Sequence, residues 1–98
     1  MLFARNVHFN VKKDKHDEFK RIFNNDVLPV LRQQNGFKHE LTLTGTDRWM
    51  GISVWQDRAS AEAYAKATYP KVLEKLTPVL DGTPKVETCE VGVTTLQS

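Results

Sequence analysis

The stretch WMGISVWQDRASAEAYAKA, residues 49–67, decides the fold of this chain. Its first seven residues alternate apolar side chains with Gly51 and Ser53, which is the period-two pattern of a strand. A helix follows almost at once, and Asp57 is expected to cap it by accepting hydrogen bonds from free amides of the first turn. Pro70 lacks an amide proton and disfavours a helical Tyr69, so we expect a kink there, where a pocket could open.

The helix after Asp57 carries a long apolar face. Its members follow the i, i+3, i+4 spacing: Ala61, Tyr64, Ala65, Thr68, Tyr69, Val72, Leu73, Leu76, Val79 and Leu80. This face must be buried against other parts of the chain. Three of its side chains carry hydroxyl groups, and each needs a hydrogen-bond partner if it loses water.

The segments on either side complete an alternating pattern. Residues 2–11 form a predicted strand with Phe3, Val7, Phe9 and Val11 on one face and Arg5 as the exception. A helical stripe then runs to about residue 34, where Asn35 and Gly36 end it. Residues 37–44 form a strand in which Phe37, His39, Leu41 and Leu43 alternate with polar residues, and residues 86–93 form the last strand.

The order is therefore strand, helix, strand, strand, helix, strand. This order predicts an α+β, ferredoxin-like βαββαβ fold, with a four-stranded antiparallel sheet and two helices on one face. A chain of 98 residues has room for one modest core, so residues 1–98 are expected to form a single domain. The uncovered face of the sheet would be partly apolar, which is typical of an interface. We therefore expect a homodimer in which two sheets close on each other.

Composition narrows the class of protein. The net charge is only +2 and no basic stripe is present, so no nucleic-acid partner is expected, although residues 12–16 form a short basic cluster. No segment is apolar enough for a signal peptide or a membrane span. The single cysteine, Cys89, excludes an internal disulfide, and we expect a cytoplasmic protein without a membrane partner.

Three segments resemble the antibiotic biosynthesis monooxygenase domain family, within the dimeric α/β barrel superfamily. They are HFNVKKDKHDEF at residues 8–19, NGF at residues 35–37 and SVWQDRASAEAY at residues 53–64. The resemblance covers nearly the whole chain, and WQDRASAEA is its most specific part. It implies a dimer of ferredoxin-like protomers with a small-molecule pocket between sheet and helices. Members oxidise quinols or anthrone-type aromatics without metal or flavin, degrade haem, or isomerise small sugar-derived signals.

The chain departs from the family pattern at several positions. Many members have Glu-x-Trp at the end of the third strand, and Ser53 replaces the acid here. Many carry a histidine where this chain has Tyr64. Aligned with the haem degraders, the position of the axial histidine is Glu74, and glutamate is a poor haem ligand. We therefore expect no cofactor.

The candidate site residues are few. His8, His16 and His39 lie on separate elements without ligand spacing, so no metal site is expected. Asp26 is the first candidate base, because it falls on the apolar stripe of the first helix, where desolvation would raise its pKa. Alternatively, its side chain reaches solvent and has no role in catalysis. His39 is a second candidate base, and Tyr64 a candidate to orient a substrate hydroxyl. Tyr69, Thr68, Trp55 and Phe23 are the candidate ligand contacts, although the aromatic residues also fit as core or dimer anchors.

Two hypotheses for function remain from this reading. In the first, the protein is a cofactor-independent monooxygenase that acts on a small aromatic or quinol substrate. In the second, it is a non-catalytic dimer of the same fold that binds a small molecule or serves in assembly. Oxygen uptake without added metal or flavin distinguishes the two.

Overall fold

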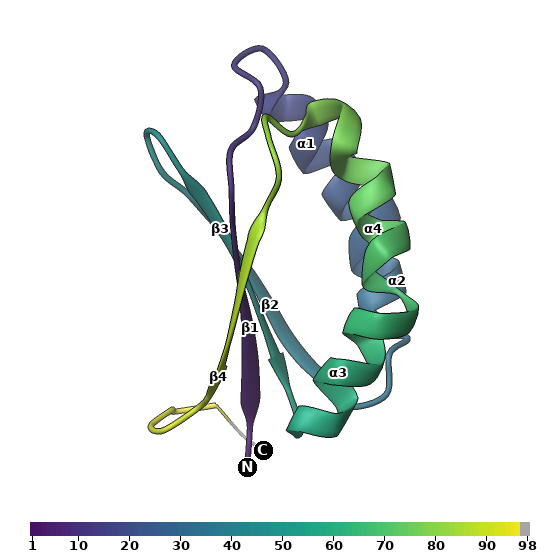
Figure 1. The fold of residues 1–98 in the computed structure, drawn as a ribbon, viewed down its shortest axis with the longest axis vertical. Coiled ribbons are helices and arrows are strands. Elements are labelled where there is room, and N and C mark those ends of the chain that lie inside the picture. Colours follow the sequence, from purple (N-terminus) through teal and green to yellow (C-terminus); the bar gives the residue numbers. More distant parts are fainter. Residues whose placement is uncertain (97–98) are drawn as a thin grey trace.

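The computed structural model describes residues 1–96. It contains a four-stranded antiparallel sheet in the order β2-β3-β1-β4, with all the helices on one face and the other face uncovered (Figure 1). The strands are β1 (Phe3–Phe9), β2 (Phe37–Thr44), β3 (Trp49–Trp55) and β4 (Lys85–Glu90). The helical segments are α1 (His16–Ile22), η1 (Phe23–Val27), α2 (Leu28–Arg32), α3 (Arg58–Ala67), α4 (Tyr69–Leu76) and η2 (Thr77–Val79). The predicted ferredoxin-like α+β fold is confirmed.

The register of the sheet determines which side chains face the helices. In β1, Arg5 lies opposite Ser53 of β3, and Ser53 in turn lies opposite Glu40 of β2. Because side chains in opposed positions point to the same face, these three form one row across three strands. This row faces the helices, since Arg5 and Ser53 are buried. The alternate positions, including Ile52 and Leu41, face away from the helices.

The first helical segment contains a π-helical turn that the sequence reading missed. Residues Phe23–Val27 form η1, between α1 and α2. A π-helical turn takes up an extra residue, so it shifts the phase of the apolar stripe beyond it. Val27 and Leu31 are therefore buried, whereas Asp26 is exposed. The predicted burial of Asp26 on the apolar stripe was wrong for this reason.

The second helical segment breaks where Pro70 predicts. Helix α3 ends at Ala67 and α4 begins at Tyr69, with Pro70 in its first turn. The predicted cap of α3 is confirmed, because an Asp57 carboxylate oxygen accepts a hydrogen bond from the Ser60 amide at 2.8 Å. That bond favours the ionised carboxylate and lowers the pKa of Asp57. Tyr64 of α3 and Tyr69 of α4 therefore lie on either side of the break.

Strand β2 contains an irregularity that separates Phe37 from the rest of its predicted face. Phe37 pairs with Trp55, whereas His39 pairs with Val54, so one extra residue lies between them. Such a bulge reverses the side-chain alternation. The Phe37 ring packs on Trp55 with the ring centroids 5.6 Å apart, while His39 is exposed beside Leu41 on the uncovered face. The predicted common face of Phe37 and His39 was therefore wrong.

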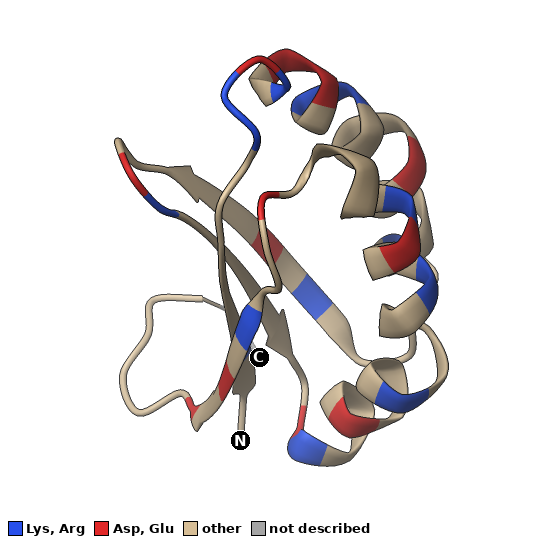
Figure 2. Ribbon diagram, turned by 45° about the horizontal axis from the view of Figure 1, so that its top comes forward, with Lys and Arg blue, Asp and Glu red and all other residues tan. Residues whose placement is uncertain are grey.

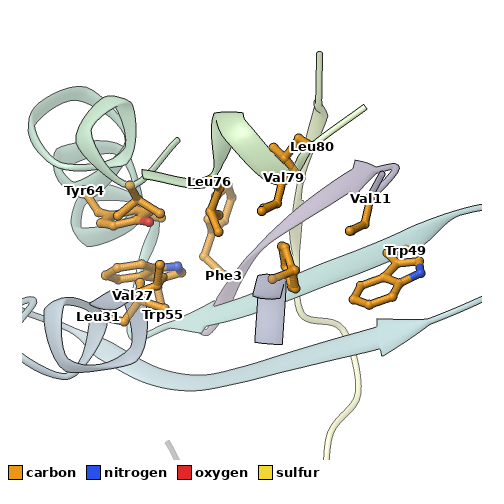
Figure 3. Close-up of a cluster of buried hydrophobic side chains, with 13 residues drawn as sticks. Phe3, Val11, Val27, Leu31, Trp49, Trp55, Tyr64, Leu76, Val79 and Leu80 are labelled. Atoms are coloured by element: carbon orange, nitrogen blue, oxygen red, sulfur yellow. The ribbon is translucent and has the colours of Figure 1, made fainter. Parts of the chain in front are cut away.

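The core lies between the sheet and the helices and has two aromatic centres. At one end Trp55 and Tyr64 pack together with their ring centroids 4.9 Å apart. At the other, Trp49 lies near Val11, and Phe3 and Leu76 lie between the two centres (Figure 3). Both tryptophans are buried, so their interpretation as core anchors is confirmed.

The C-terminal part of the chain is less covered than the rest. Strand β4 ends at Glu90, three residues earlier than predicted, and every residue in it is exposed. A predicted tail or arm at residues 94–98 lies partly outside the described residues, which end at 96. Acidic and basic residues are interspersed along the helices (Figure 2). In residues 1–96, no helix has the length and apolar character needed to cross a membrane.

Candidate functional site

A narrow cavity lies between the sheet and the break of the second helical segment. To a water-sized molecule it offers about 60 Å³. Its walls are mostly apolar and come from β1, α1, η1, α2 and α4, among them Val7, Phe9, Phe19, Phe23, Val27, Leu31, Val72, Leu73 and Leu76. Five of its lining residues are polar: Arg5, Glu40, Ser53, Tyr64 and Tyr69. A few polar groups in an apolar cavity are typical of a small-molecule site.

Arg5 is the only cation among the described residues that line the cavity. It is 4% exposed, and no described carboxylate forms a salt bridge with it. Its guanidinium carbon lies 4.4 Å from the centre of the Tyr69 ring and 5.2 Å from that of Tyr64. Aromatic faces attract a cation, but they leave guanidinium N–H donors without acceptors. Arg5 therefore contributes a positive charge to the cavity that no described acid neutralises directly.

Glu40 is the acid of the cavity. Its side chain is partly buried, and burial raises its pKa to about 8. Two effects lower this pKa and are weaker than burial. The Thr42 hydroxyl donates a hydrogen bond of 3.3 Å to Oε2 of Glu40, and Arg5 contributes a positive charge. A carboxyl group with such a pKa is mostly protonated at pH 7, yet can give and accept a proton near neutral pH.

The two tyrosines provide neutral hydroxyl groups. Burial raises the pKa of Tyr64 to about 12 and also raises the pKa of Tyr69. The positive charge of Arg5 lowers both pKa values, but by less. Both phenols therefore keep their protons at neutral pH. A protonated hydroxyl can donate a hydrogen bond to an oxygen that gains negative charge during a reaction.

Strand β3, which lies between β2 and β1, lines the cavity with small residues. Its two positions here are Gly51, which has no side-chain heavy atom, and Ser53, which has a small one. The Ser53 hydroxyl accepts a hydrogen bond of 2.8 Å from Nε1 of Trp55, so it is held against the sheet. A Cβ atom at Gly51 would lie 3.6 Å from Oε2 of Glu40 and 3.6 Å from Phe9. Any group placed over Gly51 would therefore be in van der Waals contact with Glu40 and Phe9.

A second hollow adjoins the cavity at the edge strand β2. It offers about 220 Å³ to a water-sized molecule and is lined by residues of α1, η1, α2, β2 and β3. Phe19, Phe23 and Glu40 line both spaces. Since Phe23 is only partly buried, its ring can turn more easily than that of Phe19, which is 1% exposed. Phe23 is therefore the more exposed of the two rings that line both the outer hollow and the cavity.

The structure brings together some of the residues predicted from the sequence and separates others. Tyr64, Tyr69 and Phe23 line the cavity. Trp55 is fully buried behind it, and Thr68 donates a hydrogen bond to Gln34 at 3.3 Å in another hollow. Neither Asp26 nor His39 lines the cavity, because one is exposed on η1 and the other lies on the uncovered face of the sheet.

Sequence reasoning missed the two charged residues of the cavity. The signal for Arg5 was present, because it interrupts an otherwise apolar strand face. Glu40 gave no such signal, since it occupies a regular polar position of an alternating strand. Only the bulge before His39 and the pairing with Ser53 show that this polar face turns toward the helices.

The cavity does not fit haem. The cavity offers only about 60 Å³, and no histidine, cysteine or methionine is among its lining residues in the part of the chain described. Tyr64 and Tyr69, the lining residues of a type that can ligate haem iron, have their rings against the Arg5 guanidinium, and Glu74, which aligns with an axial ligand, is exposed and lies outside the cavity. Nor do residues 1–96 place three or more His, Cys, Asp and Glu side chains together as a metal site.

Comparison with known proteins assigns the chain to a family. Residues 2–74 match the family described as antibiotic biosynthesis monooxygenase. The chain belongs to this family. The resemblance seen in the sequence is thereby confirmed. No curated protein sequence matches the chain.

Solved structures of similar shape include proteins with different activities. A monooxygenase from the gene ActVA-Orf6 of Streptomyces coelicolor, in complex with nanaomycin D, has a TM-score of 0.77 at 20% identity, covering 98% of this chain and 92% of its own. The cofactor-independent oxygenase SnoaB of Streptomyces nogalater has 0.76 at 18%, with 98% of both chains covered. The haem degrader MhuD of Mycobacterium tuberculosis has 0.77 at 16%, covering 95% and 98%. At these identities the likeness establishes the fold alone.

Proposed function

We propose that this family member is a cofactor-independent oxygenase that oxidises a small phenol or quinol in the cavity between sheet and helices. The observation that carries the proposal is Glu40, a carboxyl group inside a mostly apolar cavity that it shares with Arg5 and two tyrosines. Two of the structurally similar proteins are an oxygenase and a monooxygenase, which supports the same reaction class.

The proposed reaction begins with a proton transfer. The ionised form of Glu40 takes the proton of the substrate hydroxyl, and the phenolate that results is stabilised by Arg5 and by a hydrogen bond from Tyr64 or Tyr69. The phenolate gives one electron to oxygen, and the phenoxyl radical and superoxide combine to form a carbon–oxygen bond. The peroxide anion accepts the proton from Glu40. Loss of the proton on that carbon then breaks the O–O bond and releases water, so phenol and oxygen yield quinone and water.

The apolar walls have a role in this scheme. A dry cavity strengthens the interaction of Arg5 with the phenolate, because little water screens it. It also protects the radical pair from side reactions. The raised pKa of Glu40 matches that of a base which must exchange protons with a weakly acidic phenol near neutral pH.

We further propose that the protein works as a homodimer closed through the uncovered face of the sheet. This face carries Leu41 and Leu43, which are 57% and 45% exposed, beside Ile52. It also contains two buried polar atoms without a partner among the described residues, Oδ1 of Asn6 and Nδ1 of His8. A second copy would cover the apolar side chains and could supply the missing hydrogen bonds.

The experiment is oxygen uptake by purified protein treated with a chelator, with a panel of 1-naphthols and hydroquinones. We expect uptake by the native protein and a loss of about 100-fold or more in Glu40→Gln. Glu62→Gln, the same change at an exposed position of α3, is the matched control and should keep full activity. Asp26→Asn and His39→Gln test the bases named from the sequence. Full turnover in Glu40→Gln would refute the assignment of the base.

The alternative function is a non-catalytic dimer that binds a small molecule. The narrowness of the cavity and the replacement of the family's acid by Ser53 favour it. It predicts ligand binding without oxygen uptake by any member of the panel, and equal affinities in native protein and Glu40→Gln for a ligand that lacks a hydroxyl.

A further inference from the structure

We infer that the cavity selects a planar aromatic or enolic ligand with a carboxylate at one end, bound by Arg5, and a hydroxyl at the other, facing Glu40. This inference rests on the proposed function, because it takes the same cavity as the substrate site. It goes further by giving the ligand a second, non-reacting group. The argument has three steps: the charge of the cavity, the direction of its donors and the space between its two charged residues.

The charge of the cavity comes first. Arg5 brings a guanidinium group to the cavity, and Glu40 is mostly neutral at pH 7 because burial raises its pKa to about 8. The remaining polar lining residues are the uncharged Ser53, Tyr64 and Tyr69. The empty cavity thus holds a net positive charge near neutral pH. A buried charge without a counterion is unfavourable, and an anionic ligand would remove that cost.

The guanidinium group is also oriented for planar recognition. The rings of Tyr69 and Tyr64 lie 4.4 and 5.2 Å from its central carbon and limit its movement. Apart from these rings, no described side chain is bound to it by a hydrogen bond or a salt bridge. A guanidinium group has five N–H donors in a rigid fork, and that fork matches the two oxygens of a carboxylate. Arg5 therefore presents free donors to a carboxylate rather than to a single point charge.

The third step is the arrangement of Arg5, Ser53 and Glu40 across three strands, which limits the shape of the ligand. Arg5 and Glu40 lie two strands apart with Ser53 between them. Neighbouring strands are about 4.8 Å apart, so their Cα atoms are separated by roughly 10 Å. Both side chains line the cavity, together with Gly51 and Ser53 of β3. Because Arg5 and Glu40 enter the cavity from different strands, a ligand that contacts both must carry its carboxylate and its hydroxyl on opposite sides, as a single para-substituted ring does.

The test uses 4-hydroxybenzoate, which is not readily oxidised, so that binding is measured apart from turnover. Its affinity by isothermal titration calorimetry at pH 7 is compared with those of 4-hydroxybenzamide, which has the same shape without the charge, and of benzoate, which lacks the hydroxyl. We expect the acid to bind at least about tenfold more tightly than the amide, as for a hydrogen-bonded ion pair. Benzoate should bind more weakly than 4-hydroxybenzoate.

Variants identify the group responsible. Arg5→Met should abolish the preference for acid over amide, and Arg5→Lys should retain part of it. Arg58→Met is the matched control, because the Arg58 guanidinium also stacks on a ring, 4.9 Å from the centre of Phe3, but does not line the cavity. It should bind as the native protein does. Circular dichroism shows which variants are folded, and Arg5→Gln replaces Arg5→Met if the latter is not.

The outcomes separate this inference from the proposed function. Equal binding of acid and amide by native protein, no binding of either, or a preserved preference in Arg5→Met would each overturn it. Selective binding of the acid without oxygen uptake from any phenol would support it and refute the oxygenase. Oxygen uptake from neutral phenols with no preference for the acid would do the reverse.

Discussion

Arg5 and Glu40 face the same cavity from β1 and β2, on either side of Ser53, and yet they form no salt bridge. An acid and a base that paired directly would both be ionised and their charges would cancel. Here burial raises the pKa of Glu40 by more than the charge of Arg5 lowers it. The cavity therefore keeps one group for attraction of an anion and another for transfer of a proton.

The first prediction concerns the pH dependence of the reaction. If ionised Glu40 is the base, kcat/KM should rise about tenfold per pH unit on the acid side and level off above its pKa of about 8. Because Arg5 lowers this pKa, the midpoint should move to higher pH in Arg5→Met. Initial rates of oxygen uptake between pH 5 and 10 provide the measurement. A midpoint that does not change in Arg5→Met would show that another group titrates.

The second prediction concerns stability. The pKa of Glu40 is raised from 4.5 to about 8 in the folded protein, so the unfolded chain loses this proton first as the pH rises. Stability should therefore fall between about pH 4.5 and 8 and change little from this cause above pH 8. At about 1.4 kcal/mol per pKa unit, less the effect of partial solvent access, the loss is roughly 2–4 kcal/mol.

Glu40→Gln should remove most of this pH dependence, because glutamine does not titrate. Urea unfolding at pH 5 and pH 8.5 measures the difference, with Glu62→Gln as control. The same slope in Glu40→Gln as in native protein would mean that Glu40 is ionised at neutral pH in the folded state.

Sequence reasoning succeeded where one residue determines its own surroundings. Asp57 caps α3 and Pro70 separates α3 from α4, because a free carboxylate and a missing amide proton act locally. Sequence reasoning failed where one inserted residue changes which face the following side chains point to. The π-helical turn η1 exposes Asp26, and the bulge before His39 directs Glu40 inward and His39 outward. Neither irregularity has a marker in the local sequence, so the pattern alone did not show which acid faces the cavity.

The third prediction uses Gly51 as a probe of the space above β3. A methyl group there fits at 3.6 Å from Glu40 and Phe9, so Gly51→Ala should fold and gain about 0.5–1 kcal/mol from the lower backbone entropy of the unfolded chain. It should nevertheless weaken binding of 4-hydroxybenzoate several-fold, because the methyl group occupies the position of the ring. Gly92→Ala, with nothing within 4 Å of the added atom, is the control. Unchanged affinity in Gly51→Ala would place the ligand elsewhere.

The fourth prediction concerns access. Phe23 lies between the cavity and the hollow beside β2, so Phe23→Ala should join the two and increase the association rate of ligands in stopped-flow fluorescence. The loss of a partly buried ring should cost about 1–3 kcal/mol. Ile22→Ala removes a similar partly buried side chain that lines neither space and serves as the control for stability. An association rate that rises equally in both variants would point to general loosening rather than a gate.

The last prediction tests the homodimer. Native mass spectrometry of untagged protein should give twice the 11.2 kDa of one chain. Leu41→Glu places a charge on the uncovered sheet face, on the edge strand β2, where the native side chain is 57% exposed. It should convert the dimer to monomer, since burial of an unpaired charge is costly. Val93→Glu is the matched control, because Val93 is 97% exposed and lies beyond β4. A dimer that withstands Leu41→Glu would be formed through another surface, and the orphaned atoms of Asn6 and His8 would then need a partner other than a second sheet.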